Sequence, residues 1–134
     1  MYIFDGAMGT MLQAAGLEEG YCPELFNVEK PEVVKNIHAQ YLQHGSDVIT
    51  TNTFGACGLK LEDYDLQDRV REINIAAVKV AKDAIAEFKP SARVAGSMGP
   101  TGRFLQPLGN MSFDSIYDTY REQAEALIEG GVDF

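Results

Sequence analysis

The chain has 134 residues, 46% of them hydrophobic and 23% charged, which suits one globular domain and excludes a disordered chain. Its 20 acidic and 11 basic residues give a net charge of −9, which disfavours nucleic acid and anionic membranes as partners. The chain shows no membrane-length apolar run, no signal-peptide pattern at its start and no disulfide framework, so we expect a cytoplasmic protein.

Hydrophobic periodicity predicts three long helices that alternate with four short strands. Each helix has an apolar stripe with a spacing of three and four residues, whereas the strands are short apolar runs that fit a buried sheet. Pro31 opens the first long helix, and Gly45 closes it. The segment 7–30 is irregular, with a short helix at 11–15. The strands are expected at residues 2–4, 47–51, 93–97 and from 132, and the helices at 31–44, 67–88 and 112–129.

The order of these elements is β-α-β-α-β-α-β, with no hairpin. This order predicts an α/β fold with a parallel sheet and right-handed crossovers. An open doubly wound sheet and a (β/α)₈ barrel both remain possible. A barrel takes about 250 residues. Because a fourth strand begins only at residue 132, we expect residues 1–134 to be the N-terminal part of a larger βα fold.

The loops that follow the first three strands carry the candidate chemistry. In both folds, ligands bind at the C-terminal ends of the strands. Residues 5–10, 50–55 and 97–102 are rich in glycine, hydroxyl and amide groups, so we expect one site built from three strand ends. The alternative is that the glycines only serve tight turns. Asp5 ends an apolar strand, where it could bind an ammonium group, orient a partner or cap the turn.

Other motifs are excluded by their spacing. The segment from Gly6 to Gly9 lacks the GxGxxG pattern of a dinucleotide site, and no P-loop pattern occurs. His38 and His44 are six residues apart and cannot share one helix face. Cys22 and Cys57 lack the spacing of a zinc pair, so we expect no metal site within the chain. Neither histidine lies at the C-terminal end of a strand, so we expect no catalytic triad within the chain either.

Three motifs carry a resemblance to a known family. Residues 5–12 read DGAMGTML, residues 51–56 read TNTFGA and residues 99–102 read GPTG. In this order they resemble the homocysteine S-methyltransferase family, and most closely its cobalamin-dependent methionine synthase branch. The resemblance implies a (β/α)₈ barrel that binds homocysteine and transfers a methyl group to its zinc-bound thiolate, which gives methionine. The same resemblance implies that the loops after the first three strands bind homocysteine.

The resemblance assigns substrate roles residue by residue. It implies that Asp5, Gly6 and Ala7 hold the amino-acid end of homocysteine. It implies that the pocket is lined by Asn52, Thr53 and Phe54, with Gly99 and Pro100 as its floor.

The zinc-binding cysteine segments of the family, Asn-Cys and Gly-Gly-Cys-Cys-Gly, do not occur in the chain. Zinc, cobalamin and methyltetrahydrofolate are therefore expected to bind through the remaining half of the barrel and other domains. We expect residues 1–134 alone to be inactive. Two alternatives stay open: a non-catalytic half-barrel that self-associates through its sheet edges, and a different barrel enzyme with a phosphate ligand.

Overall fold

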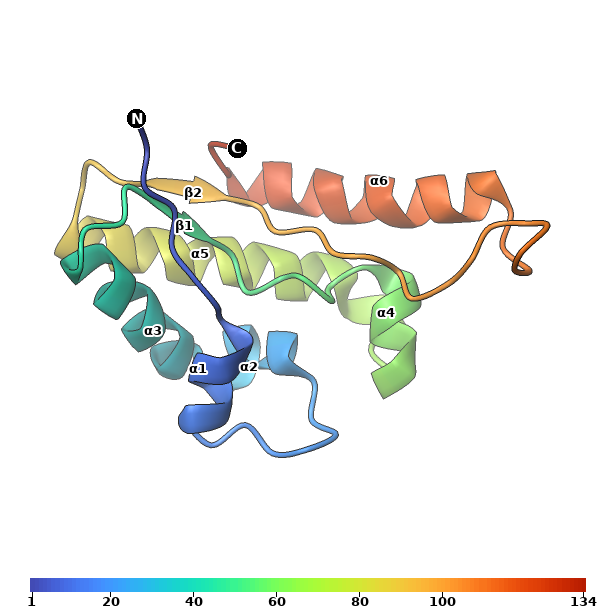
Figure 1. Ribbon diagram of the computed structural model, residues 1–134, viewed down its shortest axis with the longest axis horizontal. Coiled ribbons are helices and arrows are strands. Elements are labelled where there is room, and N and C mark those ends of the chain that lie inside the picture. Colours follow the sequence, from blue (N-terminus) through green and yellow to red (C-terminus); the bar gives the residue numbers. More distant parts are fainter.

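The computed structural model describes residues 1–134 without a gap. A small parallel sheet lies against a row of three helices, in which α5 lies between α3 and α6 (Figure 1). The strands are β1 (Val48–Thr50) and β2 (Arg93–Ala95). The α-helices are α1 (Gly9–Ala14), α2 (Phe26–Glu29), α3 (Pro31–Gln43), α4 (Gly58–Leu61), α5 (Val70–Phe88) and α6 (Phe113–Gly130). Three 3₁₀ turns complete the set: η1 (Pro23–Leu25), η2 (Glu62–Tyr64) and η3 (Gln67–Arg69).

The parallel sheet follows the order of the chain. Strand β1 pairs with β2 in a register that places Ile49 opposite Val94. On the other side of β1, Phe4 forms an isolated parallel bridge with Val48. Beyond β2, the backbone N–H of Phe134 donates to the carbonyl of Val94. Strands that lie side by side in the order of the chain are typical of a (β/α)₈ barrel. In a doubly wound sheet, the spatial order of the strands reverses beside the first strand.

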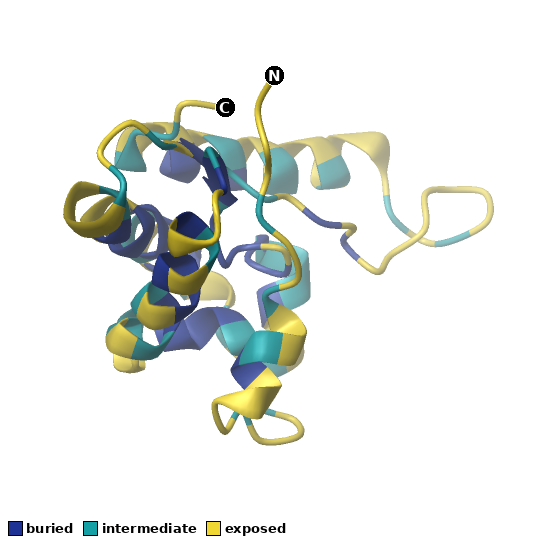
Figure 2. Cartoon of the chain, turned by 60° about the vertical axis from the view of Figure 1, so that its left-hand side comes forward, coloured by how far each residue is buried: buried dark blue, intermediate teal, exposed yellow.

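The prediction of a buried strand at residues 2–4 is wrong, because this segment forms only the isolated bridge at Phe4 and is not buried. Tyr2, Ile3 and Phe4 are 58%, 53% and 53% exposed. Only one edge of this segment is paired, through backbone bonds to Asp47 and Val48, and helices α3, α5 and α6 lie behind β1 and β2 instead. The apolar run shows only that these side chains favour burial. In the structure no element covers them, and Figure 2 shows the N-terminal segment as exposed.

The long helices lie where the periodicity predicted them, and their ends have clear physical causes. Helix α3 begins at Pro31, as expected for a residue that has no N–H to leave unbonded. Helix α6 is capped by Ser112, whose hydroxyl accepts the N–H of Ser115 at 3.1 Å. Gly131 closes the same helix with a φ of 87°, a left-handed conformation that favours glycine. None of these helices is both long enough and apolar enough to span a bilayer.

The main core lies between the sheet and the helices. Ile49 and Val94 of the sheet pack against Val78 of α5 and Leu127 of α6. Helix α6 turns a mixed face inward, because Gln123 is fully buried while the apolar Phe113 and Ile128 are both 70% exposed. A polar side chain thus occupies a core position of α6, which points to a role other than packing.

Candidate functional site

A pocket of about 420 Å³ lies at the C-terminal ends of the strands. We call it the strand-end pocket. Five of the eight predicted site residues line it, namely Gly6, Ala7, Asn52, Thr53 and Phe54. Met8, Gly9, Thr50, Thr51 and Ser97 from the predicted loops also line it, as do Pro23 and Glu24. Pro23 and Glu24 come from the irregular segment 7–30, for which the sequence predicted no function.

Asp5 lies beside the pocket and cross-links two strand ends. Its carboxylate accepts the Thr50 N–H at 2.8 Å on one oxygen and the Thr50 hydroxyl at 3.0 Å on the other. Burial raises the pKa of Asp5, and the hydrogen bonds from Thr50 counteract part of that shift. Both oxygens are thus engaged by β1. Of the roles left open for Asp5, orienting a neighbouring residue is the one its contacts display.

The two predicted floor residues lie in different places. Gly99 does not line the pocket, but its N–H donates to the carbonyl of Phe54 at 3.0 Å, so it supports the pocket wall from behind. A side chain at Gly99 would place Cβ 2.5 Å from that carbonyl oxygen. Pro100 is exposed and borders a separate hollow together with Phe104 and Tyr120.

Three polar residues at the tips of β1 and β2 form a closed ring of hydrogen bonds. The Thr53 hydroxyl donates to the Ser97 carbonyl at 2.7 Å, and the Ser97 N–H donates to the Thr51 hydroxyl at 3.0 Å. The two threonine hydroxyls are 2.6 Å apart. Because Thr53 has only one proton and gives it to Ser97, Thr51 must be the donor between them. Neither threonine hydroxyl proton is left for a ligand.

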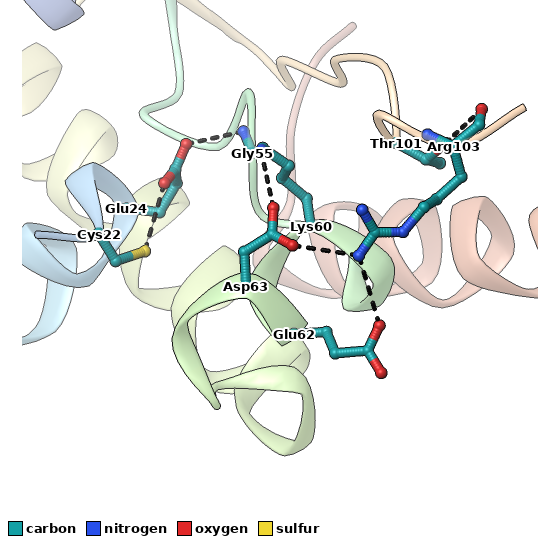
Figure 3. Close-up of polar contacts among 8 residues, drawn as sticks. All are labelled: Cys22, Glu24, Gly55, Lys60, Glu62, Asp63, Thr101 and Arg103. Carbon is teal, nitrogen blue, oxygen red and sulfur yellow. Dashed lines mark hydrogen bonds and ion pairs between the residues drawn. The ribbon is translucent and has the colours of Figure 1, made fainter. Parts of the chain in front are cut away.

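Glu24 is the one ionisable side chain that lines the strand-end pocket. It is 6% exposed, and its carboxylate accepts the Gly55 N–H at 2.7 Å (Figure 3). A Cβ at Gly55 would lie 2.8 Å from the same carboxylate, so glycine permits this close approach. The other carboxylate oxygen accepts the Cys22 thiol at 3.4 Å.

The two cysteines do not fit a zinc site. Burial, followed by the nearby charge of Glu24, raises the pKa of Cys22 to about 12, and burial also raises the pKa of Cys57. Zinc binds the thiolate, which these surroundings disfavour. The structure holds no group of three His, Cys, Asp or Glu side chains that could bind a metal ion.

We expect the Cys22 thiol to be unreactive in the folded chain. In a Cys57→Ser variant, Ellman's reagent at pH 8 should give no fast reaction until denaturant unfolds the chain, because the thiolate fraction at Cys22 is negligible. Absorbance at 412 nm follows the reaction. A full equivalent released within seconds from the folded variant would contradict the raised pKa.

The loop after β2 is tied to the segment after α4 by ion pairs. Arg103 lies 3.1 Å from Asp63 and 3.6 Å from Glu62, and Asp63 also pairs with Lys60 at 2.9 Å (Figure 3). These pairs are exposed, so each adds at most about 1 kcal/mol. Their contribution is to bring the two loops together.

Three backbone N–H groups of the strand-end pocket have no hydrogen-bond partner in the chain. The backbone N–H groups of Gly6, Ala7 and Met8 donate to no other group of the chain. The residues that carry these unbonded N–H groups and the carboxylate of Glu24 therefore line the same pocket. Such a combination suits a small ligand that carries both an anionic and a cationic group.

The fold and the pocket define a parallel βα protein with a candidate site at the C-terminal edge of its sheet. A family model described as homocysteine S-methyltransferase matches residues 2–134. The chain belongs to the homocysteine S-methyltransferase family, and the resemblance seen in the loop motifs is confirmed.

Individual relatives agree with this assignment. The chain is 40% identical to methionine synthase of Mycobacterium tuberculosis and 37% identical to that of Mycobacterium leprae, in each case over 96% of its length. It spans only 12% and 11% of these relatives. Among solved structures, the homocysteine methyltransferase MmuM from Escherichia coli in its oxidised form matches with a TM-score of 0.81 and 26% identity. That match covers 100% of this chain and 51% of MmuM. The metallated form of MmuM matches with the same TM-score over 99% of this chain and 52% of that one.

Proposed function

We propose that residues 1–134 form the N-terminal part of a homocysteine-binding (β/α)₈ barrel in a methyltransferase of the methionine synthase type. The consecutive parallel strand order and the likeness to half of MmuM support the barrel. The identity to two methionine synthases supports the reaction class, in which a methyl group passes to the sulfur of homocysteine. The relatives also suggest that homocysteine and further domains are the partners of this chain.

The observation that carries the substrate proposal is the set of free backbone donors beside a carboxylate in one pocket. The N–H groups of Gly6 and Ala7 would hold the carboxylate of homocysteine, with Asp5 keeping the adjoining strand end in place through Thr50. Phe54, which is 62% exposed, would contact the aliphatic part of the ligand.

The remaining predicted residues would act on the same ligand from the wall and from behind it. Asn52 and Thr53 line the pocket, and Gly99 supports Phe54. Pro100 would belong to the rim, since it borders the neighbouring hollow.

Methyl transfer itself is expected to need groups that this chain does not provide. Metallated MmuM and the methionine synthase relatives make zinc and cobalamin the implied cofactors of the family. Because Cys22 and Cys57 do not fit a zinc site, we place the zinc, cobalamin and folate sites in segments that the relatives have outside the matched length. Residues 1–134 then contribute substrate binding and no methyl transfer.

Calorimetric titration with three ligands tests the substrate proposal. L-homocysteine should bind to the chain, whereas 3-mercaptopropylamine, which lacks the carboxylate, should bind at least about tenfold more weakly because the Gly6 and Ala7 donors lose their partner. Inorganic phosphate should not compete. Equal binding of both thiols, or displacement by phosphate, would overturn the proposal and favour the phosphate-binding alternative.

Self-association is a second candidate property, and the exposed segment at residues 2–4 favours it. Its apolar side chains are exposed, and only one of its two backbone edges is paired, with β1 and the residue before it. The unpaired edge can pair with a second chain. Sedimentation velocity should show a dimer that the substitution Ile3→Lys dissociates, and a wild-type monomer at high concentration would exclude it.

A further inference from the structure

The loop after β1, residues 51–56, is bound by side chains from four distant points of the chain. We call this segment the β1 loop. The contacts are Glu24 to the Gly55 N–H at 2.7 Å, Asn27 to the Asn52 carbonyl at 2.7 Å, Asn74 to the Ala56 carbonyl at 2.9 Å and Gln123 to the Thr53 carbonyl at 2.8 Å. Three carboxamides from α2, α5 and α6 thus donate to three carbonyls of one short loop.

The three carboxamides occupy positions that packing alone would give to apolar side chains. Asn74 and Gln123 are fully buried, and Asn27 is 2% exposed. A buried amide is costly unless it is hydrogen-bonded, and the oxygens of Asn27 and Gln123 have no partner in the chain. The amide oxygens stay unpaired, while the N–H groups of the same amides donate to the loop. We therefore infer that the amides are present in order to bind the loop carbonyls.

Two of the amides are also linked to each other. Gln123 lies 3.3 Å from the Asn74 oxygen through the same nitrogen that donates to Thr53. Asn74 donates in addition to the Val70 carbonyl at 2.7 Å, which ties the pair to the first turn of α5. Helices α5 and α6 therefore hold the loop as one unit.

These contacts act on the residues that form the pocket wall. Gln123 binds the carbonyl of Thr53, while the hydroxyl of Thr53 belongs to the ring with Thr51 and Ser97. Phe54 follows directly, and its carbonyl accepts the Gly99 N–H. With the peptide groups on both sides of Phe54 bonded, the backbone that carries its ring is fixed.

We propose that Gln123, Asn74 and Asn27 are positioning residues, which fix the β1 loop in the conformation that Thr53 and Phe54 need in order to line the ligand pocket. The role in binding rests on the proposed function. Gln123 is the main member, because it connects α6, an element that lines no part of the strand-end pocket, to the pocket wall.

Amide hydrogen exchange and homocysteine binding together test this role. The variant Gln123→Met keeps the length of the side chain and removes its donor. We expect exchange at Gly55 and Ala56 to rise at least about tenfold, and the Kd for homocysteine to rise about tenfold, while protection at Ile49 and Val94 stays unchanged. The matched control Gln43→Met, at an exposed position of α3, should change none of these values.

Two results would overturn the positioning role: unchanged exchange in the β1 loop of Gln123→Met, or an equal rise in exchange at β1, β2 and the loop, which a general loss of stability would give. If Gln123→Met does not fold, Asn27→Leu tests the same role from the opposite side through Asn52. Failure of the proposed function is a separate observation, because it appears as absent homocysteine binding by the wild-type chain.

Discussion

Replacing Gly99 by alanine is expected to lower the free energy of unfolding by about 2–3 kcal/mol. The added Cβ would lie 2.5 Å from the Phe54 carbonyl oxygen and 2.8 Å from two atoms of the Phe54 ring. The nearest atom belongs to the backbone, so a change of rotamer cannot relieve the clash. Either the β1 loop or the loop that carries Gly99 must move, and the hydrogen bond between them is lost. Urea denaturation followed by circular dichroism measures the effect.

Gly9→Ala is the matched control for this substitution. No atom lies within 4 Å of a Cβ at Gly9, which is the first residue of α1. We expect this variant to keep the wild-type stability or to gain up to about 0.5 kcal/mol, because alanine restricts the unfolded chain. Equal unfolding midpoints for the two variants would show that the contact between Gly99 and Phe54 is not as tight as the structure has it.

Lowering the pH from 6.5 to 4 is expected to remove about 3 kcal/mol of stability through His38 alone. His38 is fully buried, both its ring nitrogens lack a hydrogen-bond partner, and burial lowers its pKa from 6.5 to about 4. In this range the unfolded state binds a proton that the folded state rejects. The free energy of unfolding therefore falls as the pH falls, and this contribution ends below pH 4, where both states are protonated.

The substitution His38→Leu isolates this effect from the titration of carboxylates. We expect the variant to lie within about 1 kcal/mol of wild type at pH 7, since it replaces an unbonded ring by an apolar side chain of similar volume. Its stability should change less between pH 6.5 and 4. Identical pH profiles for wild type and His38→Leu would refute the lowered pKa.

Local sequence signals were sufficient for the scaffold. Pro31 and Gly131 mark helix ends through their backbone conformation and Ser112 through its side-chain hydroxyl, so the helices could be placed without knowing their neighbours. The parallel sheet followed from the alternation of elements. Strand burial could not be read in the same way, because Tyr2 and Phe4 have the composition of buried residues and lack the neighbours that would bury them.

The candidate site was predictable only in the part that lies on strand ends. Gly6, Ala7 and Phe54 follow directly from the rule that ligands meet the C-terminal edge of a parallel sheet. Glu24 and Gln123 carry no such signal. A glutamate in an irregular segment and a glutamine within a helix are ordinary surface residues until the tertiary structure brings them to the β1 loop.

The separation in sequence of the contacts that hold the β1 loop has a consequence for the order of folding. Asn74 lies 18 residues from the carbonyl it binds, Asn27 lies 25 residues away and Gln123 lies 70 residues away. Contacts between residues far apart in sequence form slowly, because the chain must lose conformational entropy to close the loop before the contact stabilises it. The pocket wall therefore cannot mature until α6 has formed and docked. During synthesis on the ribosome, the ligand site would become competent only after α6 has been made.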